Sequence, residues 1–250
     1  MTPLAIRVED IWVYLAASPL LWLTITLAAY AAADRFAAAL GRPAYANPVL
    51  FAAAILVAIL LATGTAYDTF FAGAQFVHFL LGPATVALAV PLYRNLPKVR
   101  SALVPMLAAL LCGSLTAIVS AVAIAAALGA PRAIQVSLAP KSVTTPIAMS
   151  LAEQAGGIPT LAAAFVIATG IFGAVIVTPL MNALGLRDYA ARGFAAGLAA
   201  HGIGTARAFQ VDSLAGTFAG IALGLNGALT AVVLPIVLAG LFAILDALGR

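Results

Sequence analysis

The sequence has few charged residues, a single cysteine and only two histidines, and each scarcity excludes a class of protein. Asp, Glu, Lys and Arg make up 8% of the 250 residues, whereas soluble domains contain about 25%. Cys112 has no second cysteine with which to form an intrachain disulfide. The chain also contains no P-loop, no dinucleotide-binding glycine pattern and no HExxH motif. We therefore expect no enzyme site, no bound metal and no cofactor.

Hydrophobic residues, by contrast, make up 64% of the chain. They are gathered into several runs of the ~20 residues that a helix needs to cross a bilayer. The net charge of +4 comes from Lys and Arg in short loops between these runs, a pattern that reflects membrane topology rather than nucleic-acid binding. We predict an all-α, polytopic transmembrane helical bundle that forms one integral membrane domain over residues 1–250, with roughly seven to nine crossings or part-crossings.

Prolines interrupt two of the apolar segments. Gly82-Pro83 falls within the run 69–93, and Pro140 and Pro146 flank a polar stretch further along the chain. Proline removes a backbone donor and disfavours helix in the residue before it. Peptide groups left unpaired at membrane depth are tolerated only where protein or water covers them. We therefore predict two or more broken or re-entrant helices.

The two interruptions resemble each other. Residues 81–86 read LGPATV and residues 138–143 read LAPKSV, so Leu, Pro and Val coincide and a hydroxyl is kept. Paired interrupted segments are the sequence feature that indicates a transporter's midplane site. We predict repeat units at about 47–129 and 130–250. The repeat is inverted if each broken segment returns to the side it came from and parallel if each crosses fully, and alternating access favours the inverted case.

Lys141 is the most informative single residue, because a cation among apolar residues is costly unless it is paired or hydrated. Ser142, Thr144 and Thr145 place hydroxyls beside it. This combination predicts a site for a small polar solute of negative charge. The alternative is a lysine that reaches the membrane interface or pairs with Glu153.

A second polar group follows in the stretch 201–208. His201 is accompanied by Gly202, Gly204, Thr205 and Arg207, so an imidazole, exposed backbone amides, a hydroxyl and a guanidinium would converge on a carboxylate. If His201 titrates near neutral pH, it would couple transport to protons. The alternative is a packing histidine and an interfacial arginine.

Two further positions complete the predicted site. Thr85 corresponds to Ser142 in the repeated hexapeptide, and Asn226 stands between two apolar runs, where it would cap a half-helix or contact a solute. The predicted substrate-binding residues are Lys141, Ser142, Thr144, Thr145, His201, Gly202, Gly204, Thr205, Arg207, Thr85 and Asn226.

At these residues the sequence resembles the LrgB/CidB family. The matching stretches are LGPATVALAVPLYRNL (81–96), KSVTTPIAM (141–149) with the following Glu153 and Gly156-Gly157, and HGIGTARA (201–208). Ala200 departs from the pattern, since the family often has serine before the histidine. The resemblance implies a multi-pass protein of the bacterial inner membrane that works beside a small membrane protein of the LrgA/CidA type.

Two functional descriptions come with the resemblance. One is a holin/antiholin-like modulator of murein hydrolase export and cell lysis. The other is carriage of small carboxylates such as pyruvate, glycolate or glycerate, the last two in plastid relatives. Paired broken helices and a buried cation favour a secondary transporter of small monocarboxylates or 2-hydroxy acids that works by alternating access. The predicted partners are the carboxylate anion, the LrgA/CidA-type protein, the lipid bilayer and further copies of the chain, with no nucleic acid.

Overall fold

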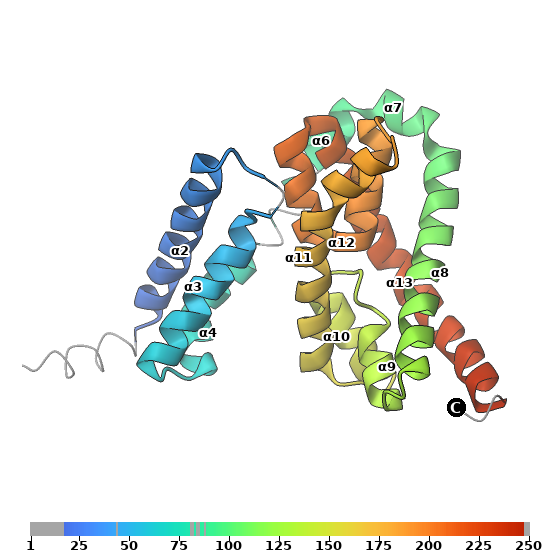
Figure 1. The fold of residues 1–250 in the computed structure, drawn as a ribbon, viewed down its shortest axis with the longest axis horizontal. Coiled ribbons are helices and arrows are strands. Elements are labelled where there is room, and N and C mark those ends of the chain that lie inside the picture. The colour runs from blue at the N-terminus through green and yellow to red at the C-terminus, as the bar shows by residue number, and fades with distance from the viewer. Residues whose placement is uncertain (1–17, 44, 81–82, 84–85, 88, 248–250) are drawn as a thin grey trace, which may run out of the picture. The chain divides into compact units, whose positions relative to one another are not determined.

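The computed structural model describes residues 18–43, 45–80, 83, 86–87 and 89–247, and the regular elements in this part of the chain are all helices. The all-α prediction is therefore confirmed. The chain divides into two compact units, Met1–Ala87 and Leu88–Arg250. The helices are α2 (Pro19–Ala39), α3 (Pro48–Thr63), α4 (Tyr67–Phe79), α6 (Ala89–Arg94), α7 (Leu96–Ser101), α8 (Leu103–Ala127), α9 (Arg132–Leu138), α10 (Thr145–Gln154), α11 (Pro159–Ala183), α12 (Tyr189–Val211) and α13 (Ser213–Ala247) (Figure 1).

Four of the described helices, α2, α8, α11 and α13, are long and apolar enough to cross a membrane. α8 and α11 each have 25 residues, which at 1.5 Å per residue gives about 37 Å of helix for a hydrocarbon layer of about 30 Å. α3 is apolar but shorter, at 16 residues. The chain is a membrane protein, as predicted.

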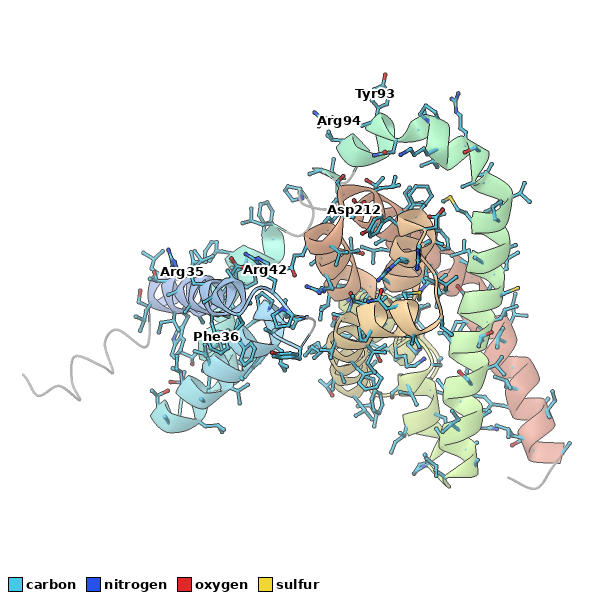
Figure 2. The ribbon with its side chains drawn as sticks, turned by 45° about the horizontal axis from the view of Figure 1, so that its top comes forward. Arg35, Phe36, Arg42, Tyr93, Arg94 and Asp212 are labelled. Carbon is cyan, nitrogen blue, oxygen red and sulfur yellow. The ribbon has the colours of Figure 1, made fainter. Side chains whose placement is uncertain are left out.

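The first unit contains α2, α3 and α4. Asn47 begins α3 by accepting hydrogen bonds from the backbone N–H groups of Val49, at 2.8 Å, and Leu50, at 3.3 Å. Beyond the end of α2, the guanidinium of Arg42 turns back and binds both carboxylate oxygens of Asp34, at 2.7 and 3.1 Å. Figure 2 shows Arg42 together with Arg35 in this unit.

The second unit is built on close packing of α12 against α13. A methyl group added at Gly193 or Gly197 of α12 would overlap the backbone of α13 at Ala215 or Ala219. The two backbones approach this closely because glycine has no Cβ. Asp212 accepts from the N–H of Leu214 at 2.7 Å and so begins α13 directly after α12 ends (Figure 2).

α12 is not a regular helix throughout. Ala200 (φ −124°, ψ 19°) and His201 (φ 41°, ψ −133°) have non-helical backbone angles. Ala196 and Ala208, on either side of them, belong to one apolar cluster, although twelve residues of straight helix would separate them by about 18 Å. The stretch 202–211 therefore folds back along 189–199.

The segments before and after α11 lie at opposite ends of it. Ile158 N–H, just before α11, donates to Ser137 Oγ of α9 at 2.7 Å. Val177, near the other end of α11, lines a small pocket with Tyr189 and Val211, which begin and end α12. In Figure 1, α9 and α10 accordingly lie at the lower end of this unit and α12 at its upper end.

α13 differs from the expectation drawn from the sequence. Asn226 was expected to stand between two runs, but α13 continues through it for 35 residues, with Pro235 also inside the helix. The Asn226 side chain hydrogen-bonds to neighbouring segments, so it does not compete with the backbone of its own helix. Gly227, the next residue, also lies within the helix, where a methyl group would be 3.0 Å from Ile147.

Candidate functional site

Lys141 lies at the depth of the middle of α8. Its ammonium donates a hydrogen bond to the carbonyl of Ala117, a central residue of α8, at 3.1 Å. The segment 139–144 that carries it is non-helical, as expected from Pro140 and Pro146, the latter standing in the first turn of α10. The ammonium thus faces the interior of the unit. Glu153, the alternative partner, is exposed near the far end of α10.

A cavity of about 460 Å³ opens beside Lys141. α8, α11, α12 and the 139–144 segment all contribute to its wall, and no carboxylate occurs among the described residues that line it. These lining residues are Cys112, Gly113, Thr116, Ala117, Lys141, Ser142, Thr169, Leu198 and Ala199. The mostly apolar lining therefore includes one lysine and three hydroxyl-bearing residues, with no carboxylate among them.

Thr116 and Thr169 were missed by the sequence reasoning. Each is a threonine inside a long apolar span, one on α8 and one on α11. Its hydroxyl was the sequence feature that could have indicated a place in the site. That signal is weak, because threonine in a membrane helix commonly bonds to its own backbone. Only the packing of α8 and α11 around Lys141 brings the two hydroxyls to one cavity.

A second cavity, of about 600 Å³, adjoins the first between α8 and α12. The two share Gly113, Leu198 and Ala199 as lining residues. Its wall is mostly apolar, with Met106 and Phe194 among its residues and Asp188, which caps α12, at one end. An open space thus runs along α12 from its amino end to the level of Lys141.

His201 is buried against α11. Its Nε2 lies 2.8 Å from the carbonyl oxygen of Val166, and since a carbonyl can only accept, Nε2 carries the proton. Gly170 makes room for the ring, because a methyl group there would lie 2.7 Å from Nε2. The hydroxyl of Thr205 donates to the carbonyl of His201 at 2.8 Å. The lining of the Lys141 cavity on α12 ends at Ala199, two residues before this histidine.

Arg207 lies in a different place from Lys141. It lines a pocket of about 20 Å³ together with Arg192, near the end of α11, and its Nη1 lies 3.4 Å from Oε1 of Gln210. Arg207 belongs to the stretch 202–211, which lies beyond the non-helical residue His201 and folds back along 189–199. The structure therefore does not bring the guanidinium to the cavity that Lys141 lines.

The remaining predicted residues have varied positions. Thr144 and Thr145 are half-buried at the start of α10. Gly202 is exposed with open space beside it, while Gly204 packs where a methyl group would lie 2.5 Å from the carbonyl of Ala196. Thr85 is outside the described residues, as is most of the first repeated hexapeptide.

Asn226 occupies the centre of a buried polar cluster. Its Nδ2 donates to the carbonyl of Ser142 and to the carbonyl of Leu198, each at 3.1 Å. Its Oδ1 accepts from the hydroxyls of Ser114 and, at 3.3 Å, Thr230. The side chain is 1% exposed. It therefore contacts the Lys141 segment and α12 rather than open space.

These features define a polytopic helical membrane protein with a cation-lined cavity halfway along its long helices. The sequence model of the LrgB-like family matches residues 26–239, and the chain belongs to this family. It is 37% identical to the uncharacterized protein YwbG of Bacillus subtilis over 78% of this chain and 86% of that one. It is 27% identical to the holin-like protein CidB of Staphylococcus aureus over 88% and 95% of the two chains. No solved structure matches it.

Proposed function

We propose that this protein is a secondary transporter of small monocarboxylates or 2-hydroxy acids, of the pyruvate, glycolate and glycerate class, across the bacterial inner membrane. The observation that carries the proposal is the ammonium of Lys141, which lies beside a cavity of about 460 Å³ with no carboxylate among its described lining residues. A cation at this depth is costly unless an anion or water accompanies it. A transported carboxylate would supply that charge whenever the site is loaded.

The cavity wall matches the chemistry of such a solute. The ammonium would bind the carboxylate through a charge-assisted hydrogen bond. The hydroxyls of Thr116 and Thr169 line the same space and would bind the 2-oxo or 2-hydroxyl oxygen. His201 does not line this cavity. Its proposed role is to couple transport to protons from the turn of α12 that follows the lining residue Ala199.

The segments on either side of α11 supply the proposed gates. We interpret 132–154 and 189–211 as two broken, re-entrant helices that approach from opposite ends of α11 and meet halfway. Such a pair of opposed hairpins is typical of transporters with inverted repeats. Alternating access would follow if each hairpin closes the site toward its own side. Both segments fall within 130–250, so they are not the pair of interruptions from which the repeat was predicted. That inverted repeat, with units at about 47–129 and 130–250, remains a prediction.

Uptake into proteoliposomes tests the proposal. The full chain is reconstituted and the uptake of labelled pyruvate and glycolate is measured over a range of concentrations. Saturable uptake that is lost in Lys141→Ala and kept in the control Lys98→Ala, at an exposed lysine of α7, would support a carrier. Non-saturable flux that is the same in both variants would contradict it.

The single cysteine provides a second readout of the same site. Cys112 is exposed and lines the cavity with Lys141, so a bound solute should shield it from a thiol reagent. Pyruvate is expected to slow maleimide labelling of Cys112 in the wild-type protein and not in Lys141→Ala. Equal labelling with and without pyruvate or glycolate would argue against binding in this cavity.

A holin-like role is the second candidate, and the names of the staphylococcal relatives favour it over the carrier. A holin-like protein would oligomerise with itself or with an LrgA/CidA-type partner and make the membrane leaky. Release of a trapped fluorescent dye from vesicles, unselective and insensitive to Lys141→Ala, would support this role. Dye retention during saturable pyruvate uptake would exclude it.

A further inference from the structure

Asn226 uses its whole hydrogen-bonding capacity on the protein. A side-chain amide has two N–H donors and an oxygen that accepts two hydrogen bonds. In Asn226 both donors bind carbonyls and the oxygen accepts from two hydroxyls. Nothing is left over for a transported solute, so the predicted role of Asn226 as a substrate contact does not fit its surroundings.

The two carbonyls that Asn226 binds come from the two irregular segments. Ser142 follows Lys141 in the non-helical stretch 139–144, and Leu198 lies in the last turn of α12 before the non-helical residues Ala200 and His201. Where a helix is interrupted, carbonyls lose their N–H partners. A buried carbonyl without a partner is costly, and the amide of Asn226 supplies a donor to each of these two carbonyls.

We propose that Asn226 is a positioning residue that fixes the Lys141 segment to the turn of α12, so that the two keep one relative arrangement. The positioning role does not require transport; only its expected effect on uptake rests on the proposed function. Asn226 sits on α13, which also packs against 189–199 through Gly193 and Gly197. α13 therefore holds the first half of α12 along its length and the Lys141 segment at one point.

A distance measurement between the two segments tests this directly. Spin labels are attached at Thr144→Cys and Gly202→Cys in a Cys112→Ala background, whose folding is checked by size-exclusion chromatography in detergent. Thr144 makes no side-chain capping bond and Gly202 has open space around it, so both sites accept a label. Electron paramagnetic resonance on the full chain then gives the distribution of distances between them.

Asn226→Asp is the central variant, because it keeps the size and the acceptors of the side chain and removes both donors. We expect the distance distribution to become roughly twofold wider, since the segments lose their shared hydrogen bonds and sample more conformations. Asn226→Leu, which removes the donors without adding charge, is measured in parallel so that the result does not depend on the folding of one variant. The matched control, Ser114→Ala, keeps both carbonyl bonds and should leave the distribution narrow.

The outcomes separate this inference from the proposed function. A distribution that stays as narrow as wild type in both Asn226 variants would overturn the positioning role, and so would equal broadening in Ser114→Ala. Broadening confined to the Asn226 variants would support it, even if the wild-type protein carries no pyruvate or glycolate. If the wild type does carry them, we expect the maximal uptake rate of Asn226→Asp to fall roughly tenfold, as the loss of two buried hydrogen bonds implies.

Discussion

The Lys141 segment and the turn of α12 interrupt their helices by different means. In the first, Pro140 and Pro146 remove backbone donors and disfavour helix in the residues before them, so the local sequence favours the interruption. In the second, 200–201 contains no proline, and a non-glycine residue takes φ 41°. The comparison teaches that a helix at membrane depth can be interrupted by covalent constraint or by tertiary packing. In both cases a nearby backbone carbonyl, of Ser142 or of Leu198, accepts a hydrogen bond from Asn226.

The two means differ in their energetics. Proline enforces its geometry in the unfolded chain as well, so the 139–144 segment needs little support to stay irregular. A non-glycine residue in the backbone region of His201 costs about 1–3 kcal/mol and persists only when its surroundings hold it there. The bond from Nε2 to Val166 and the space left by Gly170 provide that support.

The largest effect should come from removing the cation. Lys141→Ala is expected to lower the uptake efficiency for pyruvate roughly 100-fold, since losing the partner of a buried charge costs about 3 kcal/mol or more. The loss should concern binding, while the protein itself stays folded. Proteoliposome uptake measures the first and size-exclusion chromatography in detergent the second. Near-normal uptake in this variant would show that Lys141 does not bind the solute, and the Lys141 segment would then differ from the turn of α12 in its backbone alone.

A smaller but still large effect, on thermal stability, is expected at Gly170 of α11, against which the His201 ring packs. Gly170→Ala would place a methyl group 2.7 Å from Nε2 of His201, and overpacking of this kind costs about 1–3 kcal/mol. The imidazole should leave Val166 and the turn should lose its support. Thermal unfolding in detergent should show a lower midpoint for Gly170→Ala than for Gly240→Ala, where there is open space. Equal midpoints would mean that the turn does not depend on this contact.

His201 allows the strain itself to be measured. His201→Ala loses the bond to Val166 and keeps the unfavourable backbone angle, whereas His201→Gly loses the bond and relieves the angle. We expect the glycine variant to be the more stable of the two by about 1 kcal/mol, the reverse of the usual order in a helix. Thermal or denaturant unfolding of the two variants decides it. An alanine variant that is the more stable would show that the turn is not strained.

The smallest effect is expected at a proline of the other segment. Pro146 stands in the first turn of α10, where proline is favourable but other residues are tolerated. Pro146→Ala should change the unfolding free energy by less than about 1 kcal/mol. Its uptake should remain close to wild type. A large loss in either measurement would mean that the 139–144 segment depends on this proline as much as the α12 turn depends on Gly170.

The sequence indicated several residues of the candidate site, but it did not indicate which of them lie together. Lys141 and Ser142 lie in the non-helical stretch 139–144 and line one cavity, and proline and charge are local signals of such a stretch. Their role in binding stays a prediction. Arg207 was grouped with them from its nearness in sequence to His201, although it lines a separate pocket with Arg192. Thr116 and Thr169 gave no usable signal. The role of Asn226 followed only from the carbonyls that surround it.

Composition and proline placement determined that this protein is a helical membrane protein and that residues 139–144 leave the helix, because apolar run length and a missing N–H act on each segment by itself. The tertiary structure decided which residues share the cavity and where α12 turns back. Those outcomes depend on contacts between α8, α11, α12 and α13, such as the glycine of α11 that receives the imidazole of His201. A contact of this kind joins residues far apart in the chain, and no local pattern records it.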